Sequence, residues 1–429
     1  MSKKKIAAWA LYDLANTAFT SPFVTIFWPL LIIKLLGGNE FQIGATIAVG
    51  TIFFSAIVPV LGVLSDNSNV RKPFIVIPTL VMITIIAFLP SANLFWNLLL
   101  AGIATVMYNL SLTIYNALLP TLASEEEMGN ISGLGMATGF TGTLLSLLVA
   151  YLTLWYFAAG NLNVIAALKS MASPSAALET EKGIRAVFPV IGIFFLAFSL
   201  PLFFVIKDEN KKKIDLSSKN IRRISSRVIS NIKGLFKIKG MLSYILYFSL
   251  FSNALAAIDI FFFLFAYKEI GMSLSGFMLL FMFQSFGACL GAIIFGKAAD
   301  TYGAKKMLQI CTIAWILVIA AFITWKSPMI FMAAGLIGSV AFGGSLANSR
   351  TLFVFLSPKK NMGEYFGYSQ IMSRFAALIG PLLGGWLILK YGYNYALIMV
   401  IIFLLLCMAY LNKTPDLRAA DKKTRSIGH

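Results

Sequence analysis

Apolar residues form twelve long blocks along this chain, separated by short polar or charged stretches. Half of the blocks run for roughly 18–25 residues, the length that a helix needs to cross a bilayer core of about 30 Å, and the longer ones are expected to tilt or protrude. None shows the alternation of a transmembrane barrel strand. The pattern predicts an all-α membrane protein with twelve spanning helices, at residues 6–36, 42–65, 73–91, 96–120, 131–157, 184–206, 241–267, 274–299, 306–325, 328–357, 362–389 and 393–412.

The polar interruptions of this pattern repeat at a constant offset of 234 positions. A Gly-x3-Asp motif with a following basic pair occurs twice, as Gly62, Asp66, Arg71 and Lys72 and again as Gly296, Asp300, Lys305 and Lys306. A second group keeps the same offset, with Ser111, Met128 and Gly133 recurring as Ser345, Met362 and Gly367. A shared register over so long a stretch indicates duplication of a whole half-protein.

The duplication predicts two pseudo-symmetric six-helix bundles, residues 1–206 and 241–412. They are joined by a cytoplasmic linker, 207–240, and followed by a cytoplasmic tail, 413–429. In the linker, apolar residues at helical spacing alternate with basic ones. This pattern favours an amphipathic helix on the anionic inner leaflet, with a helix that binds a partner protein as the alternative.

Composition agrees with the membrane assignment, because 59% hydrophobic residues, 12% charged residues and a mean hydropathy of +0.84 exclude a soluble globular protein. The net charge of +18 would suit a nucleic-acid partner, but no nucleic-acid motif accompanies it. Most Lys and Arg residues lie in the tails and in the loops after even-numbered helices. That distribution predicts that both termini are cytoplasmic. We expect the protein in the plasma (inner) membrane. We expect a monomer.

Residues for cofactor or metal chemistry are scarce. The three cysteines, Cys289, Cys311 and Cys407, fall inside predicted helices, and the one histidine is His429. We therefore expect no disulfide, no metal site, no cofactor and no enzymatic activity. A near match to a phosphate-binding loop at 291–298 lacks the final Ser or Thr and lies in a membrane helix, so it is discarded.

Ionisable residues inside the apolar blocks are candidates for substrate contact, because a charge in the bilayer core is costly unless it faces water or protein. Asp13 either bonds a neighbouring helix or, with Tyr12 and Asn16, lines a cavity. Arg374 lies near mid-membrane and either faces that cavity or forms a buried Arg–Asp pair. Asp259 is a further ionisable residue away from the helix ends and belongs to the predicted cavity set, which Asn109, Asn253 and Gln370 complete on weaker grounds.

The repeated motif predicts a gate. Asp66 would accept hydrogen bonds from the amides at the start of the helix near Met362, and Asp300 from those near Gly129. Such a latch would close the cytoplasmic side. The predicted gating set also contains Arg71, Lys72, Lys305, Lys306 and Arg350. The basic pairs have a simpler interpretation as topology determinants.

Several stretches resemble one branch of the major facilitator superfamily, the "unknown major facilitator" branch, which includes a fungal vacuolar amino-acid effluxer linked to autophagy. The resemblance is carried by residues 9–19 (WALYDLANTAF), 115–120 (YNALLP), 132–139 (SGLGMATG), 343–353 and 364–381. It implies the major facilitator fold and transport. The chain departs from the branch in helix 7, which usually carries an Asp-Gly pair. Here the stretch reads Ser-Asn-Ala-Leu at 252–255, with Asp259 further along.

Function follows from these observations together. Duplicated halves with few intramembrane charges predict a secondary active transporter that works by alternating access. The resemblance favours export of amino acids or similar small polar metabolites, with proton coupling left open. A transporter of lipids, lysolipids or other amphiphiles and a membrane sensor that does not transport are the alternatives.

Overall fold

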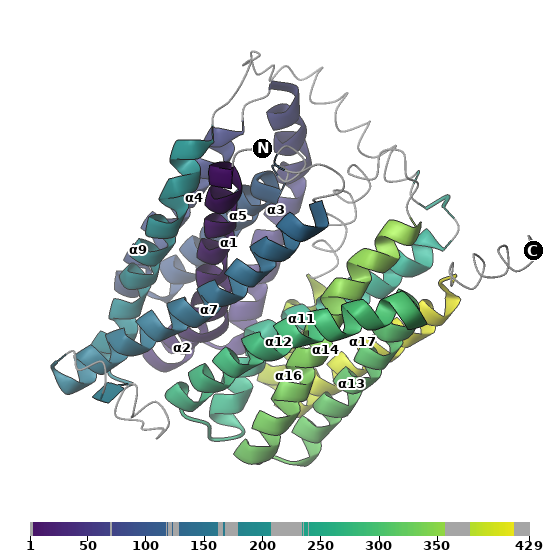
Figure 1. Ribbon diagram of the computed structural model, residues 1–429. Coiled ribbons are helices and arrows are strands. Elements are labelled where there is room, and N and C mark those ends of the chain that lie inside the picture. The colour runs from purple at the N-terminus through teal and green to yellow at the C-terminus, as the bar shows by residue number, and fades with distance from the viewer. Residues whose placement is uncertain are drawn as a thin grey trace, which may run out of the picture. The chain divides into compact units, whose positions relative to one another are not determined.

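A computed structural model of the protein describes residues 3–68, 71–116, 118, 122, 128–161, 166–167, 179–206, 234, 236–238, 240–356 and 378–415. All regular structure in these residues is helical (Figure 1). The first span consists of α1 (Lys3–Ala18), η1 (Phe19–Phe27), α2 (Trp28–Leu30) and η2 (Leu31–Leu35). The others are α3 (Glu40–Ser68), α4 (Lys72–Phe88) with η3 (Leu89–Ser91), α5 (Leu94–Asn116), α7 (Met128–Ala159), α9 (Glu181–Val205), α11 (Met241–Lys268), α12 (Leu274–Tyr302), α13 (Ala304–Thr324), α14 (Pro328–Leu356), α16 (Ile379–Tyr391) and α17 (Tyr393–Lys413).

The predicted all-α membrane architecture is confirmed. Ten helices among the described residues are long and apolar enough to cross a membrane. Helix bounds follow the apolar blocks within a few residues in the described regions. A segment buried in lipid must satisfy all its backbone hydrogen bonds internally, so the whole apolar block becomes helical. The start of the block predicted at 362–389 lies outside the described residues, and α16 is described from Ile379.

The first span is unusual in its backbone. Two π-helical segments, η1 and η2, follow α1, and Pro22 lies inside the first of them. Proline lacks an N–H and its ring clashes with the carbonyl one turn earlier, so a wider turn accommodates it. The hydroxyl of Thr25 donates to the Thr20 carbonyl oxygen at 3.0 Å, which satisfies one carbonyl in the widened segment.

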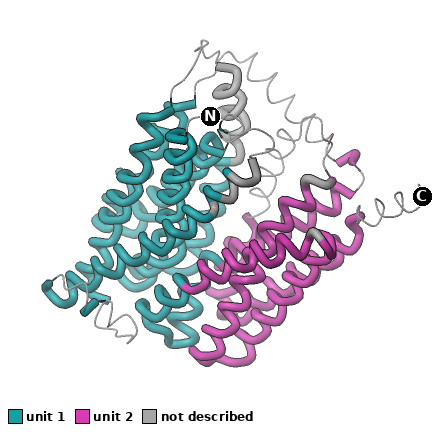
Figure 2. Tube along the Cα trace, in the orientation of Figure 1, with its two compact units in different colours: residues 1–225, 259–282 teal, residues 226–258, 283–429 magenta. Residues whose placement is uncertain are grey.

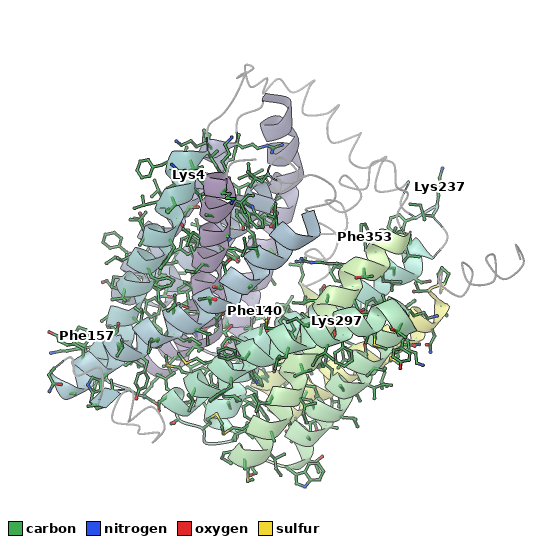
Figure 3. The ribbon with its side chains drawn as sticks, viewed as in Figure 1. Lys4, Phe140, Phe157, Lys237, Lys297 and Phe353 are labelled. Carbon is green, nitrogen blue, oxygen red and sulfur yellow. The ribbon has the colours of Figure 1, made fainter. Side chains whose placement is uncertain are left out.

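The described chain divides into two compact units (Figure 2). Unit 1 comprises residues 1–225 and 259–282, and unit 2 comprises residues 226–258 and 283–429. The unit boundary therefore passes through α11 and α12, so that the end of α11 and the start of α12 join unit 1. In unit 1, Lys4 and Phe157 mark opposite ends of the bundle (Figure 3). We call the end near Phe157 the far end.

Within unit 1, α1 is packed against its neighbours by aromatic residues and close glycine contacts. The Trp9 indole N–H donates to the Tyr115 carbonyl oxygen at 3.3 Å, the Tyr115 hydroxyl donates to the Trp9 carbonyl oxygen at 3.1 Å, and the two rings stack at 4.9 Å. On the other side, Gly142 of α7 touches the Leu14 carbonyl oxygen. Small residues of this kind let membrane helices approach closely.

Unit 2 repeats part of this arrangement. Residue 349 is the duplicate of residue 115, and its carbonyl oxygen accepts from the Tyr244 hydroxyl at 2.9 Å, again joining the first and fourth helices of a half. A second link joins α11 to α16, where Gly380 lies against the backbone of Asn253. The backbone N–H of Gly380 donates to the Asn253 side-chain oxygen at 2.7 Å. The duplicated sequence thus keeps equivalent helix contacts in both halves.

Candidate functional site

One face of the first span is polar and accessible. Asp13 and Thr17 are half-buried and Thr20 is exposed, while most residues around them are buried. Residues four and seven positions apart lie on the same face of a helix. The hydroxyls of Thr17 and Thr20 donate to carbonyl oxygens of their own helix, to Leu14 at 2.9 Å and to Thr17 at 3.4 Å. Their lone pairs remain available as acceptors. We call Asp13, Thr17 and Thr20 the α1 polar stripe.

Glycines of α7 position this stripe. A side chain added at Gly135 would come within 3.2 Å of an Asp13 carboxylate oxygen, and one added at Gly139 within 3.3 Å of the Thr17 methyl group. Both glycines therefore leave room for the α1 polar stripe. The carboxylate of Asp13 therefore lies next to α7.

Tyr12 and Asn16 share a different face of α1. Tyr12 is fully buried, and its hydroxyl and that of Thr79 hydrogen-bond at 2.6 Å. Asn16 is 3% exposed, and neither atom of its side-chain amide has a hydrogen-bond partner among the residues that the structure describes. Both residues pack inside unit 1 rather than on the accessible face that includes Asp13. Adjacent positions on a helix differ by about 100° in direction, so neighbours in sequence need not share a surface.

Asp259 is an exposed carboxylate within a spanning helix. It lies in the second half of α11, and its side chain is exposed although Ile258 and Ile260 on either side of it are buried. Within the described residues it makes no hydrogen bond or ion pair. Ser252 and Ala256, seven and three positions earlier, are half-buried on the same side of the helix. An exposed carboxylate in a membrane helix is tolerated where it meets water rather than lipid. The face of α11 around Asp259 is therefore suited to an aqueous path.

The predicted asparagines serve helix contacts. Asn253 is buried, and besides its contact with Gly380 its amide N–H donates to the Ser249 carbonyl oxygen at 3.0 Å. Asn109 is also buried and donates to the Thr105 carbonyl oxygen at 2.9 Å. Both amides are therefore engaged with the protein itself in this structure.

The predicted gating cations lie in different settings. Lys305 donates to the carbonyl oxygens of Asn412 and Thr414, at 3.0 and 2.7 Å, and so caps the end of α17. The ammonium of Lys306 lies 5.5 Å from the centroid of the Tyr302 ring. Arg71 and Lys72 are half-buried at the start of α4, and Arg350 is exposed on α14.

Other predicted residues are described only in part or not at all. The helical backbone is described at Asp66 of α3 and at Asp300 of α12, whereas their side chains lie outside the described part of the structure. Gln370 and Arg374 lie outside the described residues altogether. The duplicate of Arg374 in the first half is Phe140, which lies half-buried on α7 (Figure 3).

The sequence analysis missed two sets of residues. Thr17 and Thr20 follow Asp13 at helical spacing, and that spacing could have identified them. At the far end of unit 1, the side chain of Glu179 is only 5% exposed and binds Lys34 at 2.6 Å and Tyr267 at 2.8 Å. No local pattern marks Glu179, because its partners lie far away in the sequence.

Comparison with known families gives a match over most of the chain. The profile of the family described as "Vacuole effluxer Atg22 like" matches residues 43–422. The uncharacterized MFS-type transporter YxiO of Bacillus subtilis (strain 168) is 22% identical over 402 residues, covering 89% of this chain and 87% of YxiO. The multi-drug resistance efflux pump PmrA of Streptococcus pneumoniae is 21% identical over 396 residues, covering 88% of each protein.

Solved structures share the fold. The D-xylose-proton symporter superposes with a TM-score of 0.68 at 14% sequence identity, covering 96% of this chain and 98% of the symporter. At this level of identity the similarity concerns the arrangement of helices. It confirms the all-α major facilitator fold that the sequence resemblance implies, with ten candidate spans among the described residues.

Proposed function

The chain belongs to the vacuole effluxer Atg22-like family of membrane transporters, and from this premise we propose that it exports amino acids or similar small polar metabolites. Transport would proceed by alternating access, in which the two halves expose a central path to each side in turn. The substrate class is taken from the sequence resemblance to the branch that includes a fungal vacuolar amino-acid effluxer. The words "effluxer" in the family description and "efflux pump" in the description of PmrA support the direction.

The observation that carries the proposal is the exposed carboxylate of Asp259 on α11. Together with the α1 polar stripe it provides acceptor groups on two spanning helices, and Thr17 and Thr20 contribute hydroxyl oxygens. A substrate with an ammonium group fits such acceptors, because a carboxylate in a membrane helix gains most from a positive partner. In this proposal, Arg374 binds the carboxylate of the same substrate through two parallel hydrogen bonds.

Proton coupling is part of the proposal. The same carboxylate that binds an ammonium group in one state of the cycle can bind a proton in another, and exchange between the two couples their movements. Asp259 suits this role because it has no cationic partner among the described residues. Both termini would face the cytoplasm, with the protein acting as a monomer in the plasma (inner) membrane.

A binding assay tests the substrate class. Purified protein would be screened for ligand-induced increases in thermal stability against a panel of amino acids, nucleosides and lysolipids. An amino acid should stabilise the protein, and Asp259→Asn should remove the effect. Glu181→Gln is the matched control, because Glu181 is an exposed carboxylate that pairs with Arg185 on its own helix. Stabilisation by lysolipids alone would contradict the proposal in favour of amphiphile transport.

A further inference from the structure

Two buried carboxylates lie at the far end of unit 1, close to where the second half of the chain contributes a helical hairpin. Glu179 precedes α9, and its side chain is 5% exposed. Glu40 is the first residue of α3, and its side chain is 7% exposed. Buried carboxylates require compensating donors, because loss of hydration otherwise makes the charged form costly. Their donors show what these residues connect.

Glu179 receives three donors. The Lys34 ammonium lies 2.6 Å from one of its oxygens and the Tyr267 hydroxyl lies 2.8 Å from the same oxygen. Its other oxygen accepts from the backbone N–H of Leu274 at 3.3 Å. Lys34 also lies 5.9 Å from the centroid of the Tyr267 ring, a cation–π distance. One loop carboxylate therefore joins the end of the first span to both helices of the α11–α12 hairpin.

Glu40 makes the second connection. Its carboxylate oxygen accepts from the Lys268 ammonium at 2.7 Å. Lys268 is the last residue of α11 and directly follows Tyr267. The two carboxylates thus bind adjacent residues at one corner of the hairpin. Each bond runs from the first duplicated half of the sequence to the second, over 88 and 228 positions respectively.

The ion pairs have the properties of a contact that can open. The side chains of Lys34 and Lys268 are 34% and 36% exposed, so water reaches both ammonium groups. Separation would leave the cations solvated and would require water to reach the carboxylates. The contact is made by polar and charged groups of Glu179, Glu40, Lys34, Tyr267 and Lys268. When it opens, these groups can replace their protein partners with water, whereas an apolar contact would expose hydrophobic surface.

We propose that Glu179 and Glu40, with Lys34, Tyr267 and Lys268, form a releasable latch that holds the far end closed and opens once in each transport cycle. Tyr267, Lys268 and Leu274 all lie within residues 259–282, the part of the second half that belongs to unit 1. It rests on the proposed transport by alternating access, in which the far end must open. It is separate from the predicted latch at Asp66 and Asp300, which concerns the opposite end.

Distances between spin labels test the latch without a substrate. Labels at Ser91, in η3, and at Ser273, before α12, report the separation of the first half from the hairpin, in a protein whose three native cysteines are replaced. The double variant Glu179→Gln/Glu40→Gln keeps side-chain size and removes both charges. We expect the ratio of long-distance to short-distance populations to rise about tenfold or more, since hydrogen bonds to charged groups are the stronger ones.

Controls separate a latch from a structural contact. Glu181→Gln removes a carboxylate whose 2.9 Å pair with Arg185 stays within α9, so the distances should not change. The charge exchange Glu40→Lys/Lys268→Glu, on otherwise native residues, should keep the short distance, whereas each single change should lengthen it. A double variant with lower thermal stability but an unchanged distance distribution would overturn the proposal. Because no substrate is used, that failure would leave the proposed transport function intact.

Discussion

At the scale of single residues, the structure separates polar groups by the face of the helix that carries them. Asp13, Thr17 and Thr20 share an accessible face, whereas Tyr12 and Asn16 are buried. The cost of a charge in a membrane was sufficient to select Asp13 and Asp259 as candidates from the sequence. It could not distinguish an accessible face from a buried one, because that distinction depends on which helices surround α1.

Close contact of α1 with α7 makes glycine necessary at position 142. A methyl group added there would meet the Leu14 carbonyl oxygen and the Thr17 hydroxyl, and the backbone cannot move aside easily. We expect Gly142→Ala to destabilise the protein by about 1–3 kcal/mol, as overpacking usually does. Gly192→Ala is the control, because its nearest neighbours would lie at an ordinary 3.5 Å. Thermal unfolding in detergent measures both, and equal melting temperatures would contradict the packing argument.

Arg374 gives a prediction about recognition. Arg374→Ala should abolish binding of a carboxylate-bearing substrate and leave the protein folded, since losing one partner of a desolvated charge pair costs roughly 2–5 kcal/mol, or about 30- to several-thousand-fold in affinity. Arg374→Lys should restore binding only in part, because lysine keeps the charge and lacks the planar fork. The measurement is ligand affinity together with thermal stability. A destabilised alanine variant with full affinity would assign Arg374 a structural role instead.

At the scale of helices, hydrophobic blocks were enough to predict where spans begin and end, because lipid imposes the same length on each of them. The π-helical segments of the first span could not be predicted this way. A hydrophobic pattern does not show whether a backbone N–H bonds the carbonyl four or five residues earlier. Pro22 is the local feature of the sequence that indicates an irregular turn. The cap of α17 was equally hidden, since Lys305 lies more than 100 positions before the carbonyls that it binds.

That cap yields a prediction for α17. Replacing Lys305 with Met removes the cation at the helix C-terminus and leaves the carbonyl oxygens of Asn412 and Thr414 without this donor. We expect a loss of about 0.3–2 kcal/mol in stability, the usual range for a charge at a helix end. Lys306→Met should have a smaller effect, because Lys306 contacts the exposed ring of Tyr302. The order of the two melting temperatures checks this, and a larger loss for Lys306→Met would refute the capping role.

At the scale of the whole molecule, the duplication visible in the sequence predicted two related halves, and the family resemblance implied the major facilitator fold. It did not predict that the end of α11 and the start of α12 would pack with the first half. The duplicated pattern shows which residues the two halves share. The contacts of Glu179 and Glu40 involve residues that are not part of that shared pattern. Such asymmetric contacts depend on side chains brought together from distant positions, and no repeat or periodicity reveals them.

The predicted membrane orientation has a direct test. Single cysteines replacing Ser170, between the fifth and sixth predicted spans, and Asn220, in the predicted linker between the halves, should be labelled from opposite sides of the membrane. A membrane-impermeant maleimide added to intact cells should modify the first and spare the second, since the basic linker is expected in the cytoplasm. Labelling of both positions from the same side would exclude the twelve-helix topology with cytoplasmic termini.

Transport by the purified protein tests the central claim most directly. The protein would be reconstituted in proteoliposomes, and uptake of radiolabelled amino acids would be measured with and without a pH gradient. Wild-type protein and the Glu181→Gln control should accumulate at least one amino acid in a gradient-dependent manner, while Asp259→Asn should fall to the level of empty liposomes. Uptake by Asp259→Asn at the wild-type rate, with the same dependence on the gradient, would contradict the account.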